Sequence, residues 1–264
     1  MVIVENRKSQ SAPPLFTIVT VVRNGSTTLQ KCINSIKAQT FQDFEYLIID
    51  GASSDGTIDL IRDNSDVVSF AMSEEDQGLY FAMNKGLKQA RGKYVGILNA
   101  DDIYFPNTLD LVQEAFRKDS NSDVIYGAMS YFNQPDRAHF IHSDELPNRM
   151  IFHPTCFVSI ETYKRIGDFD TKYQVAADYE FIMRCFKAGE NFLGLKHALA
   201  IFSDGGASAR LRLRSILETS EIQARYNSES KFHRYKKLLR MLVATYLRAL
   251  LGKARGWLNA IMRR

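Results

Sequence analysis

The chain has 264 residues, of which 45% are hydrophobic and 24% are charged, a composition typical of a globular protein and unlike that of disordered or fibrous chains. No run of about 18 apolar residues occurs, which argues against a membrane-spanning helix, and residues 1–14 lack the apolar core of a secretory signal. The three cysteines are widely spaced, which favours unpaired thiols in a reducing compartment over disulfides or a metal knuckle.

The net charge of +4 hides an uneven distribution of charged residues. Residues 210–264 contain 14 Lys and Arg residues against 3 Asp and Glu residues, whereas residues 1–209 contain 20 and 27. A basic tail on a mildly acidic body predicts that the tail has an anionic surface as its partner.

Apolar runs of strand length alternate with helical periodicity along most of the chain. Residues 1–14 are expected to form a flexible leader. Strands are predicted at Phe16–Val22, Phe44–Asp50, Val67–Met72, Tyr94–Leu98 and Val124–Tyr126. Helices are predicted from Ser26 or Thr27 to Gln39, and at Ile58–Asn64, Leu79–Ala90 and Asn107–Lys118. This alternation predicts an α/β fold with a mainly parallel central sheet flanked by helices.

The polar residues that follow these strands should meet at one edge of the sheet, where open α/β sheets bind ligands. Asn99 is followed closely by the adjacent carboxylates Asp101 and Asp102. Such a pair suits a Mg²⁺ or Mn²⁺ ion that also binds substrate phosphates, although it could instead cap the helix that follows.

Asp50 closes its strand in the same way. Its carboxylate could accept a hydrogen bond from a nucleobase or a ribose hydroxyl, or it could simply form a turn before Gly51. Because the loops lack the G-x-G-x-x-G and P-loop patterns, neither a dinucleotide site nor a P-loop site is predicted.

The order and spacing of these segments resemble the family 2 glycosyltransferases, which have the GT-A fold. The similarity extends from Phe16 to about Ser208 and is closest to bacterial enzymes that build surface polysaccharides and O-antigen-type glycans. It is carried by Thr17–Asn24, Ile49–Thr57, Ser73–Gly78, Ala82–Gly86 and Asn99–Asp102. The resemblance implies a GT-A catalytic domain at residues 15–209, with a nucleotide-sugar-binding half at 15–131 and an acceptor half at 132–209.

The family implies inverting transfer of a sugar from a nucleotide-sugar, expected to be UDP-linked, with Mn²⁺ or Mg²⁺ on the diphosphate. Asp102 resembles the direct metal ligand. Asn99 departs from the family's Asp-x-Asp pattern at its first position, which leaves fewer carboxylates for the metal. The resemblance implies nucleotide-sugar binding by Thr20, Val22, Arg23, Asp50, Asn84, Asn99, Asp101 and His153.

The second half of the chain is expected to supply the acceptor site. Helices are predicted at Ile160–Ile166 and from Ala176 to Ala188, and Asp178 lies in the first turn of the latter. Asp178 resembles the family's catalytic base, which takes the proton of the acceptor hydroxyl as its oxygen attacks C1. The alternative is a carboxylate that favours the helix N-terminus only through the helix dipole. Phe202–Ser208 could close over the diphosphate or serve as a linker.

Residues 210–264 are predicted to form a basic amphipathic helical tail. Arg210–Tyr226 has a helical pattern, and from His233 onward leucines recur at three- and four-residue steps. This pattern is typical of a helix in a membrane interface, while packing on the catalytic domain or on another subunit is the alternative. The protein is therefore expected to be cytoplasmic and peripheral on the inner face of the cell membrane through residues 231–264, with no nucleic-acid partner.

The leading hypothesis is a glycosyltransferase that extends a saccharide or lipid-linked saccharide acceptor. A nucleotidyltransferase would show a longer Gly-rich basic loop after the first strand than Arg23-Asn24-Gly25 provides. A non-catalytic nucleotide-sugar-binding scaffold at the membrane is the third hypothesis. The joint presence of Asp50, Asp101, Asp102 and Asp178 argues against it.

Overall fold

The computed structural model describes residues 1–7, 12–203 and 211–227. Among these residues, ten strands form one sheet in the order β1-β4-β3-β2-β5-β9-β7-β10-β6, with β8 paired to β7. The strands are β1 (Val2–Glu5), β2 (Phe16–Val22), β3 (Phe44–Asp50), β4 (Phe70–Ser73), β5 (Tyr94–Ile97), β6 (Ile103–Tyr104), β7 (Val124–Tyr131), β8 (Gln134–His139), β9 (Phe157–Ser159) and β10 (Phe192–Phe202).

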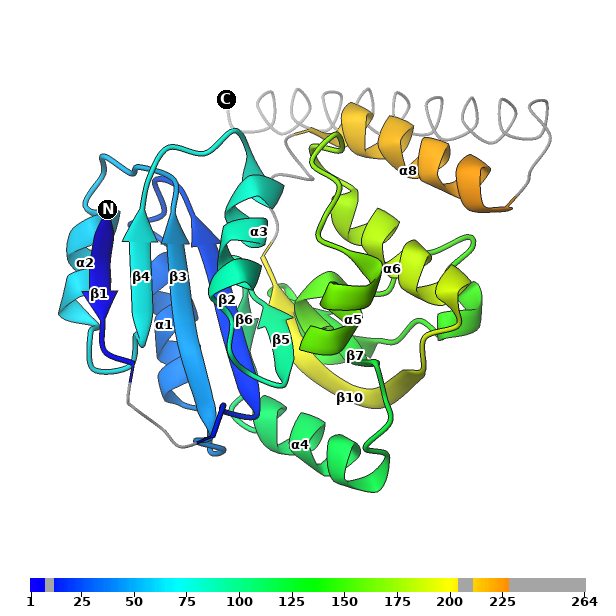
Figure 1. The fold of residues 1–264 in the computed structure, drawn as a ribbon, viewed down its shortest axis with the longest axis horizontal. Coiled ribbons are helices and arrows are strands. Elements are labelled where there is room, and N and C mark those ends of the chain that lie inside the picture. Colours follow the sequence, from blue (N-terminus) through cyan, green and yellow to red (C-terminus); the bar gives the residue numbers. More distant parts are fainter. Residues whose placement is uncertain (8–11, 204–210, 228–264) are drawn as a thin grey trace, which may run out of the picture.

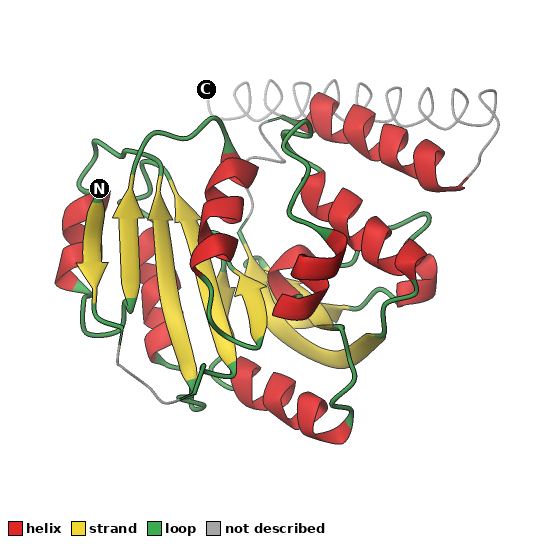
Figure 2. Cartoon of the chain, viewed as in Figure 1, coloured by secondary structure: helices red, strands yellow, loops and turns green. Residues whose placement is uncertain are grey.

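Helices lie on both faces of this sheet (Figure 1, Figure 2). The helices are α1 (Leu29–Lys37), α2 (Thr57–Asp63), α3 (Leu79–Gln89), α4 (Thr108–Lys118), α5 (Ile160–Ile166), α6 (Ala177–Ala188) and α8 (Arg212–Asn227). The predicted α/β class is therefore confirmed.

Apart from β1, the N-terminal half of the sheet is parallel. Strands β4, β3, β2 and β5 run side by side in one direction, as the alternation of strands and helices predicted, and β2 and β3 have the predicted bounds. Every residue of β2 is buried. Ile18 belongs to a core that includes residues of α1, whereas Val19 belongs to a second core, on the opposite face, that includes residues of α3. A strand covered on both faces is mostly apolar, which explains why β2 consists of Phe, Ile and Val apart from two threonines.

Helix α3 packs directly on β2 and β3 (Figure 1). This close approach requires Gly86, because a Cβ at that position would collide with Val19. The helix begins immediately after Gly78, whose φ of 144° favours glycine. Because α3 follows β4, its first turn starts at the carboxyl edge of the parallel strands, where the site is expected.

The C-terminal half of the sheet is mixed. Strand β9 pairs antiparallel with both β5 and β7, and β10 then runs parallel to β7. The sequence did not predict β10, because shifts of register between Leu195 and Ala200 interrupt the apolar alternation. Helix α5 matches its predicted range, and α6 begins one residue after its predicted start at Ala176.

The prediction of a flexible leader is wrong for the first residues of the chain. Val2–Glu5 forms β1, which pairs antiparallel with β4, and the amino group of Met1 donates a hydrogen bond to the carbonyl of Ser73 at 2.7 Å. Val4 is buried by this pairing. The run is too short to stand out in the sequence, and the pairing partner lies about 70 residues away.

Helix α8 packs against α6 (Figure 1). Ile222 is fully buried, and the Tyr226 hydroxyl donates to Glu180 of α6 at 2.7 Å. The helix predicted at Arg210–Tyr226 is therefore confirmed within two residues. The proposed membrane-binding segment, residues 231–264, lies outside the described residues. In the part of the chain that is described, no helix is long and apolar enough to cross a bilayer.

Candidate functional site

The loops after the parallel strands meet at one edge, as predicted. Asp50, at the end of β3, is fully buried. Its carboxylate accepts hydrogen bonds from the backbone N–H and the hydroxyl of Ser53 and from the hydroxyl of Ser73, the last at 2.6 Å. Asp50 therefore ties the loop after β3 to the end of β4, and its carboxylate is occupied by protein donors rather than exposed to a base.

The loop between β2 and α1 is bonded to the loop after β3. Asn24 has a φ of 53°, donates its backbone N–H to the Ser53 hydroxyl at 2.7 Å, and accepts from the Ser54 N–H at 2.9 Å. Asp55 accepts from Ser26 and Thr57, and these bonds lower its pKa. The two loops form one rigid wall at the edge of the sheet.

Thr20 and Val22, expected to bind the nucleotide-sugar, point into the core instead. Both side chains are buried, and the Thr20 hydroxyl accepts from Tyr46 at 3.1 Å. Their prediction is corrected because β2 is covered on both faces, so neither side chain faces the edge. Arg23, the next residue, is exposed and lies over Gly51, and it remains a candidate for donor contact.

Asp76 joins the site although the sequence reasoning gave it no role. Its Oδ1 pairs with Lys85, which also bonds Glu74 at 2.6 Å. Its Oδ2 is buried and has no hydrogen-bond partner among the described residues, and it lies against Gly51. The sequence does contain a signal for Asp76, because this residue lies in Ser73–Gly78, one of the segments that resemble the family. An unpartnered buried acceptor is costly unless a ligand satisfies it.

Asp102 is the buried member of the carboxylate pair after β5. Its exposed fraction is 0%, and its oxygens accept from the Ser203 N–H and the Asn99 amide, each at 3.1 Å. Burial and then the charge of Asp101 raise the pKa of Asp102 to about 7. Because Asp102 is buried and already accepts hydrogen bonds from protein donors, whereas Asp101 is partly exposed, Asp101 is a second candidate for the direct metal ligand beside Asp102.

The residues at this edge fit a divalent cation that is completed by substrate. No cluster of three or more His, Cys, Asp or Glu residues in the described chain is arranged to hold a metal by itself. Asp101 supplies a carboxylate, and the side-chain oxygen of Asn99 is buried without a partner among the described residues. Mg²⁺ and similar ions commonly bind one or two carboxylates together with substrate phosphates and water, so the donor set is sufficient.

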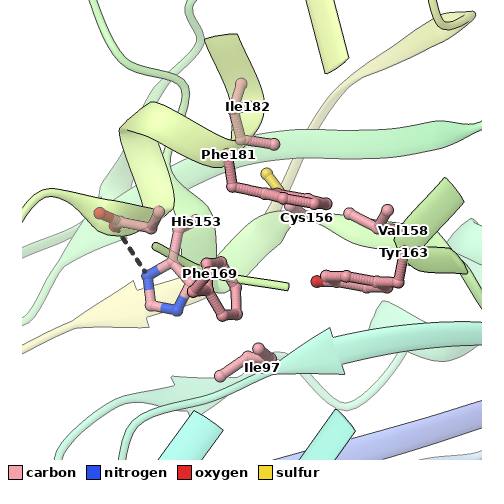
Figure 3. A pocket seen from close by; sticks show the side chains of 9 residues that line it. Ile97, His153, Cys156, Val158, Tyr163, Phe169, Phe181 and Ile182 are labelled. Carbon is pink, nitrogen blue, oxygen red and sulfur yellow. Dashed lines mark ion pairs between the residues drawn. The ribbon is translucent and has the colours of Figure 1, made fainter. Parts of the chain in front are cut away.

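Asp178 lies in the first turn of α6 with 14% of its side chain exposed. Its Oδ1 accepts from the Tyr80 hydroxyl at 2.8 Å and from the Tyr179 backbone N–H at 2.9 Å. The Nδ1 atom of His153 lies 3.6 Å from Oδ2, and the dashed line in Figure 3 marks this pair. Asp178 is thus a partly exposed carboxylate whose Oδ1 atom is fixed by two hydrogen bonds.

His153 was expected near the donor phosphates or the metal, but the structure places it beside Asp178. Burial lowers its pKa, and the charge of Asp178 offsets part of this effect. The Nε2 atom of the imidazole is buried without a partner among the described residues. His153 is therefore grouped with Asp178, the candidate for the catalytic base, and not with the donor phosphates.

His153 and Asp178 are among the residues that line a cavity of about 20 Å³, whose lining side chains are drawn in Figure 3. Most of its walls are apolar. It is lined by Ile97, His153, Cys156, Val158, Tyr163, Phe169, Asp178, Phe181 and Ile182.

Asn84 does not face the donor site as expected. Its amide donates to the carbonyl of Phe169 at 2.9 Å and accepts from the N–H of Phe169 at 3.0 Å. Both halves of the amide are therefore used to bind α3 to the loop before α6. The prediction for Asn84 is corrected to this structural role.

Two solved structures bound to nucleotide-sugars share this fold. A fragment of S. aureus TarS (1-349) in complex with UDP-GlcNAc has a TM-score of 0.65 and 18% identity, covering 86% of this chain and 71% of that chain. A mannosyltransferase from Pyrobaculum calidifontis, in complex with GDP-Man and Mn²⁺, has a TM-score of 0.66 and 18% identity, covering 89% and 72%. The chain covers 42% of a longer TarS structure. The fold is that of the GT-A class.

Sequence relatives identify the family. The PGL/p-HBAD biosynthesis glycosyltransferase of Mycobacterium tuberculosis (strain ATCC 25177 / H37Ra) is 34% identical over 181 residues, 66% of this chain and 71% of the relative. The chondroitin synthase of Pasteurella multocida is 27% identical over 188 residues, 67% of this chain and 19% of that protein. The sequence profile of glycosyl transferase family 2 matches residues 17–187. The chain belongs to this family and is a nucleotide-sugar-dependent glycosyltransferase.

Proposed function

We propose that this protein moves a sugar, with inversion, from a UDP-linked donor to a hydroxyl of a saccharide acceptor. The observation that carries the proposal is the geometry of Asp178, a partly exposed carboxylate with one oxygen held by protein donors and the other facing only His153 among the described residues. Asp178 is the base in this reaction. Membership of the family favours sugar transfer over the nucleotidyltransferase hypothesis.

The reaction follows from these positions. The acceptor oxygen attacks C1 of the donor sugar while its proton passes to Asp178, and the bond between C1 and the diphosphate oxygen breaks. The nucleoside diphosphate leaves with the electron pair of that bond. A divalent cation held by Asp101 and the Asn99 oxygen would neutralise charge on the diphosphate.

The donor end of the site lies between Arg23, Gly51 and Asp76. The unpartnered Oδ2 of Asp76 is suited to accept a hydrogen bond from the nucleoside, while Asp50 fixes the loop that forms the wall. The TarS fragment bound to UDP-GlcNAc supports a UDP-linked donor, and the mannosyltransferase bound to GDP-Man makes GDP-linked donors the alternative.

A thermal-shift panel tests this proposal. UDP, GDP and dTDP are each added with and without Mn²⁺ to the full-length protein. A ligand at about 100 times its dissociation constant stabilises the fold by roughly 2.7 kcal/mol, so we expect a clear metal-dependent shift with UDP. A shift with GDP alone would mean that the donor is GDP-linked and not UDP-linked. No shift with any nucleotide would contradict the proposed site.

We further propose that the acceptor is lipid-linked, in bacterial surface polysaccharide synthesis, and that residues 231–264 bind the anionic inner face of the membrane. The start of α8 supports a surface of this kind, because Leu211, Leu213 and Leu217 are exposed there beside Arg212 and Arg214. Apolar side chains among basic ones suit an anionic lipid surface.

Deleting residues 231–264 is expected to move the protein from the membrane fraction to the soluble fraction, because most of the basic excess is lost. Sedimentation with vesicles containing anionic lipid measures this change, and vesicles of neutral lipid are the control. The thermal shift with UDP checks that the truncated protein is folded. A folded truncated protein that still sediments with anionic vesicles would contradict the membrane role of the tail.

A further inference from the structure

Tyr80 connects the donor half of the site to the base candidate. It lies in the first turn of α3, at the edge where the parallel strands end, and is 98 residues from Asp178 in the sequence. Its hydroxyl donates to Oδ1 of Asp178 at 2.8 Å. Neither composition nor periodicity indicates such a contact, because a tyrosine on the buried face of an amphipathic helix is ordinarily a core residue.

The Tyr80 hydroxyl is fixed in place by its surroundings. The side chain is 3% exposed, and its ring packs on Phe169 with the centroids 5.7 Å apart. Asn84, one turn further along α3, binds both backbone groups of the same Phe169. The tyrosine therefore approaches Asp178 from a rigid support shared by α3 and the loop before α6.

The hydroxyl also remains a donor. Burial and the neighbouring charge of Asp178 raise the pKa of Tyr80 well above its ordinary value, so the phenol keeps its proton across the physiological range. A carboxylate that accepts from a fixed O–H cannot rotate without breaking that bond, and a hydrogen bond to a charged group is among the stronger ones in proteins.

The two oxygens of Asp178 consequently differ. Oδ1 accepts two hydrogen bonds, from the Tyr80 hydroxyl and from the Tyr179 backbone N–H. Oδ2 has only the Nδ1 atom of His153, at 3.6 Å, beyond hydrogen-bond distance, in the described part of the chain. The atom with a free lone pair is therefore Oδ2.

We infer that Tyr80 is a positioning residue that holds Oδ1 of Asp178, so that Oδ2 is the oxygen that receives the proton of the acceptor hydroxyl. This inference rests on the proposed function of Asp178 as the base. Tyr80 touches neither donor nor acceptor in this scheme. It acts by fixing the orientation of the carboxylate, and misorientation of a catalytic group by a fraction of an ångström lowers the rate of the chemical step.

The test replaces Tyr80 with Phe, which keeps the ring against Phe169 and removes only the hydroxyl. Diphosphate release is measured with Mn²⁺ on UDP-GlcNAc, UDP-glucose, GDP-mannose and dTDP-glucose, with water as the acceptor. We expect kcat to fall about ten-fold or more while the donor KM stays within about two-fold, because the bond acts on the base and not on the donor. A purely structural role would not separate kcat from KM in this way.

Tyr94→Phe is the matched control. Its hydroxyl is also buried and donates to a carbonyl, that of Ser122 at 2.6 Å, but it lies at the start of β5, the end of the strand opposite Asp101. Tyr94→Phe should lower the melting temperature without lowering kcat. If both variants lose the same activity in proportion to lost stability, the positioning role of Tyr80 is overturned.

A double variant separates this inference from the proposed function. Tyr80→Phe added to Asp178→Asn should cause no further loss of the residual turnover, measured over long incubations, because there is no carboxylate left to orient. A further ten-fold loss would overturn the inference, as would full kcat in Tyr80→Phe alone. Full turnover in Asp178→Asn, or no release from any donor by the wild type, would instead contradict the proposed function and with it the role of Tyr80.

Discussion

Replacing Asp178 with Asn is expected to lower sugar transfer by about 10³-fold or more while leaving nucleotide binding unchanged. Asn has the same shape as Asp and can still accept the hydrogen bond from Tyr80, but it cannot take a proton from the acceptor. Loss of a general base costs about 10²–10⁴-fold in rate. The donor edge is built by other loops, so the dissociation constant for UDP should not change.

The measurement compares diphosphate release with calorimetric binding of UDP in the same preparation. Asp170→Asn is the matched control, because Asp170 lies in the loop before α6 and is partly exposed, and its carboxylate bonds the N–H and the side chain of Lys172. This variant loses the same charge and should keep full activity. Unchanged turnover in Asp178→Asn would remove this residue from the role of base.

The layout of the fold was readable from the sequence because its signals are local. β2 and β3 are mainly apolar runs bounded by polar turns, and their predicted bounds are those observed. α5 and α6 end at Gly167 and Gly189, both of which have positive φ, so their C-termini are marked by residues that tolerate this backbone. β10 has no such signal because irregular pairing breaks its period.

The direction of each side chain was not readable in the same way. The period-two alternation of a strand identifies its two faces only when one face is polar, and β2 is buried on both. The sequence pattern therefore did not indicate that the Thr20 hydroxyl bonds Tyr46 within the core. The sequence placed Asp178 correctly at a helix start, but its partner Tyr80 depends on how α3 and α6 pack, which no local pattern encodes.

The assignment of the metal ligand can be decided between two adjacent residues. Asp101→Ala is expected to abolish the Mn²⁺ dependence of the UDP thermal shift, because it removes the partly exposed carboxylate at the edge. Asp102→Asn should keep that dependence, since the buried side chain can still accept from Ser203. The expected loss in Asp101→Ala is most of the roughly 2.7 kcal/mol that a ligand at 100 times its dissociation constant supplies. The reverse pattern would restore Asp102 as the direct ligand.

The burial of Asp102 has a separate consequence for stability in EDTA. Its pKa is raised to about 7 in the folded protein, against about 3.9 in an unfolded chain. Between about pH 4 and pH 7 the folded state thus binds a proton that the unfolded chain has released, so the free energy of unfolding decreases as pH rises and this decrease levels off above about pH 7.

Asp102→Asn lacks this titration. Relative to the wild type, the free energy of unfolding of Asp102→Asn should therefore increase as pH rises, by roughly 2–4 kcal/mol between pH 5 and pH 8. Urea unfolding with EDTA present measures this difference. Asp55→Asn is the comparison, because hydrogen bonds lower the pKa of Asp55 and the folded state therefore favours its charged form. The change with pH relative to the wild type should have the opposite sign in this variant. An Asp102→Asn variant with the same pH dependence as the wild type would mean that Asp102 is solvated. It would then be as available to a cation as Asp101, and the distinction between the two carboxylates would fail.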